Sequence, residues 1–228
     1  MKRLEALFRK YSYLWVIPAY AVFYLTGFIY LENRSTPSYH IIHTVFDDYI
    51  PFNEIFIIPY YLWFLFVPFA VFLTIMADRQ EFNRCFTFLS IGMTVFLIIS
   101  AVYPNGALLR PSVFPRDNIF TSMVMGLYAT DTATNLFPSI HVYNSLGAMF
   151  AILCCEKYKN NHLLRAASVI MCVLIILSTV FLKQHSVFDV VTGLIMGLIM
   201  YILVYELNFS IFPENGGIRR IFSRRSLS

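Results

Sequence analysis

Six long runs of apolar residues are the feature of this sequence that most restricts its fold. Each run is close to the roughly 20 residues that an α-helix needs to cross the hydrocarbon core of a bilayer. The chain is 58% hydrophobic and only 13% charged, which excludes a water-soluble domain of this size. The runs predict helices near Tyr13–Leu31, Ile55–Met76, Phe86–Tyr103, Ser139–Cys155, Ala166–Leu182 and Val187–Glu206.

The positions of the basic residues predict how this bundle is oriented. An even number of spans puts both termini on one side, and Lys and Arg favour the cytoplasmic side. Of the 17 Lys and Arg residues, only Arg34, Arg110, Arg116 and Lys183 fall on the other side. We therefore predict one all-α, polytopic membrane domain over residues 1–228, a six-transmembrane-helix bundle with both termini cytoplasmic and a basic cytoplasmic tail over 207–228. The net charge then reflects topology and contact with membrane lipids, and no nucleic acid is expected as a partner.

Two outer connections carry polar residues. The longer one, Pro104–Pro138, is expected to form a short helix over Asn118–Asp131 that lies on the outer surface. The first outer loop resembles a metal cluster only by composition, and we expect its ionisable side chains to be solvated. These side chains are His40, His43, Asp47, Asp48 and Glu54.

Polar and ionisable residues at the outer ends of the predicted helices are the candidates for function, because such residues are costly at membrane depth. They are Arg110, Ser139, His141, Lys183, His185 and Asp189. Topology brings them into one layer but does not by itself bring them into contact. Other interpretations stay open: a structural His–Asp pair, basic side chains that reach lipid headgroups, a capping serine, or a metal site formed by the two His and the Asp.

These residues resemble three motifs of the type 2 phosphatidic acid phosphatase superfamily, membrane lipid phosphatases related to the vanadium haloperoxidases. The family patterns are Lys-x6-Arg-Pro, Pro-Ser-Gly-His and Ser-Arg-x5-His-x3-Asp. Here they read Tyr103-x6-Arg110-Pro111, Pro138-Ser139-Ile140-His141 and Ser178-Thr179-x5-His185-x3-Asp189. The motif region thus covers residues 103–189. Three positions depart from the patterns, since Tyr103 replaces the Lys, Ile140 the Gly and Thr179 the Arg.

The resemblance implies a metal-independent hydrolase without a cofactor, acting on a lipid phosphate. The candidate substrates are phosphatidic acid, phosphatidylglycerol phosphate and polyprenyl pyrophosphate. His185 is the expected nucleophile and forms a phosphohistidine, while Asp189, one helical turn on, orients its ring. His141 is expected to protonate the leaving alcohol and then to activate water.

The phosphate group is expected to contact Arg110, Ser139 and Lys183, with Lys183 compensating for the missing motif Arg. The expected location is the plasma membrane, with the active site on the extracytoplasmic side. Two alternatives remain. One is a lipid phosphotransferase that passes the phospho group to an alcohol, similar to inositol phosphoceramide synthase. The other is a non-catalytic, lipid-binding relative.

Overall fold

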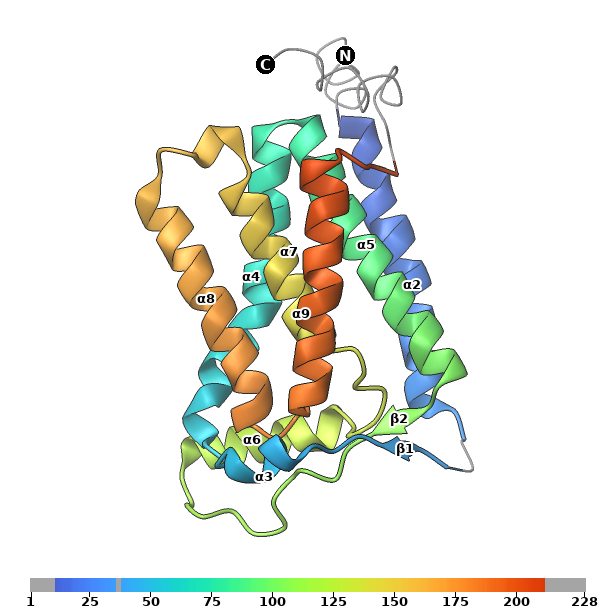
Figure 1. The fold of residues 1–228 in the computed structure, drawn as a ribbon, viewed down its shortest axis with the longest axis vertical. Coiled ribbons are helices and arrows are strands. Elements are labelled where there is room, and N and C mark those ends of the chain that lie inside the picture. The colour runs from blue at the N-terminus through green and yellow to red at the C-terminus, as the bar shows by residue number, and fades with distance from the viewer. Residues whose placement is uncertain (1–10, 36–37, 212–228) are drawn as a thin grey trace, which may run out of the picture.

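Long α-helices make up most of the protein, which confirms the all-α prediction, in a computed structural model that describes residues 11–35 and 38–211. The long helices run side by side as a bundle, and most of the short elements gather at one end of it (Figure 1). The long helices are α2 (Val16–Asn33), α4 (Ile57–Ala77), α5 (Arg79–Val102), α7 (Ile140–Leu153), α8 (His162–Phe181) and α9 (Val187–Tyr201). The short elements are η1 (Ser12–Trp15), β1 (His40–Ile41), α3 (Val45–Tyr49), η2 (Glu54–Phe56), β2 (Asn105–Gly106), α6 (Ile119–Thr130), η3 (Glu156–Tyr158) and η4 (Ile202–Glu206).

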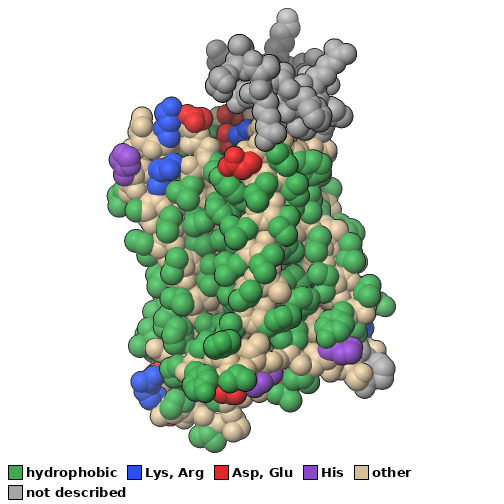
Figure 2. All heavy atoms as spheres, in the orientation of Figure 1, with side chains coloured by type: hydrophobic (Ala, Val, Ile, Leu, Met, Phe, Trp, Pro, Cys, Tyr) green, Lys and Arg blue, Asp and Glu red, His purple; other side chains and the backbone are tan. Residues whose placement is uncertain are grey.

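The surface of the bundle is apolar around its middle. Within the described part of the chain, five helical segments are long and apolar enough to cross a membrane, which is typical of an integral membrane protein. They are Ser12–Asn33, Glu54–Ala77, Arg79–Val102, His162–Phe181 and Val187–Glu206. Figure 2 shows hydrophobic side chains across the middle of the visible face and charged side chains gathered toward its two ends. Lipid tails are the solvent that such a surface requires.

One predicted span, Ser139–Cys155, is shorter than expected. It corresponds to α7, which has 14 residues and at about 1.5 Å per residue falls short of the roughly 30 Å hydrocarbon core. Most of its side chains are buried, because α4, α5, α8 and α9 pack around it. The start of α2 and the end of α9 lie at the same end of the bundle (Figure 1). The six-span topology stays a prediction, and the terminal basic residues that supported it lie outside the described residues.

Helix α9 lies very close to α7 because α9 has glycines where the two helices cross. A Cβ atom at Gly197 would lie 2.5 Å from Leu146 Cδ1, and one at Gly193 would lie 3.0 Å from the carbonyl oxygen of Ser139. Any larger side chain would push the helices apart. This close packing holds the start of α9 against the start of α7, where the candidate site lies.

The long outer loop contains the predicted short helix, and its contacts with Glu54 of the first outer loop correct a second expectation. The short helix is confirmed as α6, with Asn118 as its N-cap. Glu54 is not solvated: it is 2% exposed and accepts hydrogen bonds from Arg116 and from Asn118 Nδ2. A buried carboxylate needs such partners, and the loop supplies them when it returns to the start of α4. Glu54 therefore anchors the long loop to the bundle.

Candidate active site

The two histidines of the candidate site meet at the end of the bundle that carries the short elements. His141 lies in the first turn of α7, and His185 lies in the loop between α8 and α9. The Nδ1 atom of His141 is 3.3 Å from the Nε2 atom of His185, and both side chains are buried. The structure thus brings together two residues that are 44 positions apart.

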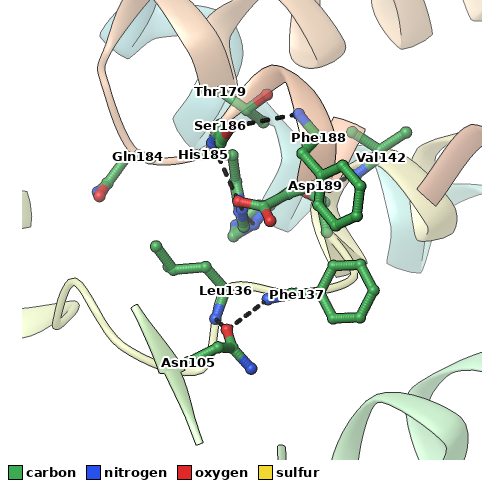
Figure 3. Close-up of polar contacts among 12 residues, drawn as sticks. Asn105, Leu136, Phe137, Val142, Thr179, Gln184, His185, Ser186, Phe188 and Asp189 are labelled. Carbon is green, nitrogen blue, oxygen red and sulfur yellow. Dashed lines mark hydrogen bonds and ion pairs between the residues drawn. The ribbon is translucent and has the colours of Figure 1, made fainter. Parts of the chain in front are cut away.

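Asp189 lies on the other side of the His185 ring (Figure 3). Its Oδ2 atom is 3.5 Å from His185 Nδ1, which is longer than an ordinary hydrogen bond. The same oxygen accepts a hydrogen bond of 3.0 Å from the backbone N–H of Ser186 and forms a capping box at the start of α9. Asp189 is fully buried, so its orientation is fixed by the helix start that it caps.

The end of α8 explains why His185 has this position. Lys183 adopts a positive φ of 54°, and the N–H groups of Lys183 and Gln184 bond to the carbonyl oxygens of Val180 and Thr179. This is the Schellman pattern that ends many helices, usually with glycine at the left-handed position. The Thr179 carbonyl also accepts from the N–H of His185 at 3.0 Å. Thr179, which stands where the family pattern has Arg, therefore fixes this turn through its backbone carbonyl.

Ser139 joins the starts of two helices. Its Oγ atom accepts from Val142 N at 3.4 Å as the N-cap of α7, and its own N–H donates to the carbonyl oxygen of Asp189 at 3.3 Å. Ser139 is fully buried beside His141. The predicted phosphate-binding serine is thus at the N-terminus of the helix that carries one of the two histidines, where the helix dipole favours an anion.

Arg110 reaches the site from the loop after β2 and is held by three acceptors. Its guanidinium donates to the carbonyl oxygens of Tyr128 and Asp131, at 3.1 and 2.6 Å, and to Gln184 Oε1 at 2.6 Å. It also lies over the Tyr128 ring, 4.3 Å from the centroid. Burial lowers the pKa of Arg110, although an Arg stays charged at every physiological pH. The bond to Gln184 links the first motif to the residue that precedes His185.

Aromatic side chains close the other side of the site. The rings of Tyr60 and Trp63, on α4, lie 4.7 and 4.5 Å from the His141 ring between centroids. The Tyr60 hydroxyl donates to Asp131 Oδ2 at 3.0 Å, and the Asp131 carbonyl accepts from Arg110. These contacts therefore link the aromatic side chains beside His141 to Arg110 through Asp131. Sequence reasoning missed Tyr60 and Trp63, because aromatic residues in an apolar run give no indication of a site.

Among the described residues, two buried donors beside this site have no partner. Within residues 11–35 and 38–211, Arg110 Nε and Gln184 Nε2 find no hydrogen-bond acceptor. Gln184 is 2% exposed, and a buried N–H group without an acceptor is unfavourable. These unsatisfied donors make Arg110 and Gln184 candidates for binding an anion. Gln184 was also missed from the sequence, since no family pattern singles it out.

Lys183, from the expected site, and Tyr103, from the first motif, have other partners. The Lys183 ammonium group donates to the backbone carbonyl of Asp47 at 2.6 Å, and burial lowers the pKa of Lys183. The Tyr103 ring stacks on His40 with 4.2 Å between centroids. Neither contact joins the two histidines. The idea that Lys183 compensates for the missing motif Arg therefore stays a prediction.

Asp47 is an unexpected part of this region, and the expectation that it is solvated is wrong. It is 3% exposed. Its Oδ2 accepts from Ser186 Oγ at 2.6 Å and its Oδ1 from Val187 N at 2.7 Å. Burial alone would raise the pKa of Asp47, but these bonds and those from Thr44 hold it below its ordinary value. His43 and Asp48, in contrast, are exposed to solvent as expected, and they pair with each other there.

Nothing in the described ranges groups three His, Cys, Asp or Glu side chains closely enough to hold a metal ion. The two histidines and Asp189 instead lie in a row, with His185 Nε2 facing His141 and His185 Nδ1 facing Asp189.

A family model described as the PAP2 superfamily matches residues 87–212 of the chain. No curated protein and no solved structure gives a significant match. The matched range contains both histidines, Asp189 and Arg110, whereas Asp47, Tyr60 and Trp63 lie upstream of it.

Proposed function

Because the chain belongs to the PAP2 superfamily, whose members are generally phosphatases, we propose that it is an integral-membrane lipid phosphatase. The substrate is a lipid phosphomonoester or pyrophosphate, of the phosphatidic acid, phosphatidylglycerol phosphate or polyprenyl pyrophosphate type. The observation that carries this proposal is the row formed by His141, His185 and Asp189, with contacts of 3.3 and 3.5 Å. Such a row orients a neutral imidazole and puts a second imidazole beside its reactive atom.

In the first step, His185 Nε2 attacks phosphorus and the bond from phosphorus to the leaving oxygen breaks. His141, whose ring lies next to that nitrogen, donates a proton to the departing oxygen. The Nδ1–H of His185 faces Asp189, which stabilises the charge that develops on the ring. In the second step, His141 removes a proton from water as the water attacks the phosphohistidine, and free phosphate leaves. Substrate binding is expected to move the two rings apart, because the phosphoryl group must lie between them, and to shorten the 3.5 Å contact between His185 and Asp189.

The phosphate oxygens lie between Arg110 and the start of α7. Arg110 and Gln184 each have a buried donor that no described residue satisfies, and an anion attracts both. Ser139 adds the positive end of the α7 dipole. Lys183 is proposed to contribute charge after its ammonium group leaves the Asp47 carbonyl. The reaction uses no metal ion and no cofactor.

The proposed topology follows from the burial of α7 and from the positions of the basic residues. We propose that α7 completes a six-span bundle with both termini in the cytoplasm, because its neighbours shield it from lipid and a short buried helix need not match the bilayer thickness. The candidate site then faces the extracytoplasmic side of the plasma membrane. The basic residues near the other end, such as Arg79, Arg84 and Lys157, agree with this orientation.

The test measures release of phosphate from purified protein in detergent, with EDTA present, on a panel of lipid phosphates. His185→Ala is expected to reduce turnover at least about a thousandfold. His162→Ala is the matched control, because His162 is exposed at the start of α8, at the opposite end of the bundle from the site. Acid-labile, base-stable labelling of wild-type protein by a ³²P-labelled substrate, absent from His185→Ala, would identify the phosphohistidine.

Three outcomes would contradict parts of the proposal. Full turnover by His185→Ala removes the assigned nucleophile, and turnover that EDTA abolishes removes the metal-free reaction. A phosphorylated alcohol in place of free phosphate, when an acceptor alcohol is added, would instead identify a phosphotransferase. No turnover on any lipid phosphate would favour a non-catalytic relative.

A further inference from the structure

An apolar groove runs along the bundle between α5 and α9 and ends beside the candidate site. Its volume is about 340 Å³, and its lining includes Ile91 to Ile99 on α5, Thr192 to Met200 on α9, and Phe137 and Pro138 at one end. Each helical wall covers eight residue steps, or roughly 12 Å at the rise of an α-helix. The groove is therefore long and narrow.

The groove exists because α9 packs unequally on its two neighbours. Gly193 and Gly197 bring α9 tightly against α7. On the side facing α5, Gly92 has no side chain, and the Tyr143 ring fills the space beneath it, where a Cβ atom would lie only 2.0 Å from the ring. Gly92 therefore lines the groove with its backbone, and about half the surface of Ile195 stays exposed at the rim.

The lining presents almost no polar atoms. Thr192 is the one lining side chain with a hydroxyl, and it donates to the carbonyl oxygens of Phe188 and Asp189 at 2.9 and 3.0 Å. An apolar groove whose rim lies on the lipid-facing surface of a membrane bundle suits a hydrocarbon chain and no polar ligand.

The end of the groove is built from the same segments as the candidate site. Pro138 precedes Ser139, the N-cap of α7, and the Phe137 ring stacks on Phe188 with 5.4 Å between centroids. Phe188 is followed directly by Asp189. Asn105 Oδ1 fixes this end by accepting from the N–H groups of Leu136 and Phe137, at 2.8 and 2.9 Å (Figure 3). A molecule in the groove therefore has its end next to the site.

We propose that this groove binds one hydrocarbon chain of the lipid whose phosphate group reaches His185. The inference rests on the proposed function and extends it, because it assigns the hydrocarbon chain of that lipid to one groove of the bundle. The chain enters from the bilayer past the exposed rim at Ile195. The Pro138 end then sets the distance between the chain and the reacting phosphorus.

The test blocks the groove and compares two substrates with the same headgroup. Ile195→Trp is expected to lower the ratio of kcat/KM for dipalmitoyl over dibutyryl phosphatidic acid by at least about tenfold, because the indole occupies the space of the long chain. Val173→Trp is the control, since Val173 is exposed to lipid on α8, away from the groove. The control is expected to leave the ratio unchanged. An unchanged ratio in Ile195→Trp would overturn the proposal.

A second measurement does not depend on turnover. A long-chain phosphatidic acid with a diazirine near the end of one chain should photolabel α5 and α9 in wild-type protein, and Ile195→Trp should abolish this labelling. Equal labelling by a phosphatidylcholine with the same chain would mean that bulk lipid fills the groove, and would overturn the assignment to substrate. If wild-type protein labels selectively but hydrolyses neither substrate, the proposed reaction fails while the groove assignment stands.

Discussion

Asp47 holds the loop that carries His185, and its replacement by asparagine tests that role. The carboxylate accepts four hydrogen bonds, two from Thr44 and one each from Ser186 and Val187. An asparagine of nearly the same shape has one acceptor oxygen, so its NH₂ group must face at least one of these donors. Losing one bond to a buried charge costs about 1.5–3 kcal/mol.

This loss can be measured as thermal stability in detergent. For a chain of this size, about 1.5–3 kcal/mol corresponds to a fall in Tm of roughly 3–12 °C. Asp48→Asn is the matched control, because the side chain of Asp48 is 65% exposed and pairs only with His43 on the surface, where an ion pair contributes about 0.2–1 kcal/mol at most. Turnover should fall as well in Asp47→Asn, since Ser186 and Val187 adjoin His185. Equal Tm values for the two variants would refute this reasoning.

The pH dependence gives a second check on Asp47. Because its pKa is lower in the folded protein than in the unfolded chain, its contribution to stability is complete above the unfolded pKa. It is lost as the pH falls through the folded pKa. The difference in Tm between wild-type protein and Asp47→Asn should therefore be constant near neutral pH and shrink below about pH 4. A difference that grows in acid would contradict the assignment.

Two further predictions concern the loop and the packing of the bundle. Lys183→Gly removes the proposed phosphate-binding charge and the bond to the Asp47 carbonyl but suits the positive φ at this position, so KM for a lipid phosphate should rise about tenfold with little net change in Tm. An unchanged KM would show that Lys183 does not compensate for the missing motif Arg. Gly92→Ala should destabilise the protein by about 1–3 kcal/mol, because its Cβ would meet the buried Tyr143 ring. Gly126→Ala, with open space around it, should stabilise α6 by about 0.5–1 kcal/mol, and the reverse order of Tm values would contradict the described packing.

Most of the helices could be predicted from the sequence, because hydrophobic runs of bilayer length have few alternatives to a helix. The short helix α6 was also predictable, since Asn118 marks its start and Asp131 its end. The shortness of α7 was not, because the apolar run continues past its ends. Where a helix stops inside a bundle depends on the neighbours that cover it.

The site was predictable where the spacing of residues carries the chemistry. His185 and Asp189 lie one helical turn apart in any helix, and the motif order indicated that His141 belongs with them. The inward positions of Asp47 and Glu54 were not predictable. Their partners, Ser186 and Arg116, are 139 and 62 residues away, and nothing in the local sequence distinguishes a loop carboxylate that finds such partners from one that faces water.

The bond between Arg110 and Gln184 means that the guanidinium is occupied before any substrate arrives. In the proposed reaction a phosphate oxygen competes with the amide oxygen for Arg110, and its negative charge makes it the stronger acceptor. In this proposal, Arg110 binds phosphate by exchanging one hydrogen-bond acceptor for another. This exchange also breaks the bond between Arg110 and Gln184, the residue before His185. We therefore expect phosphate binding to change the position of His185.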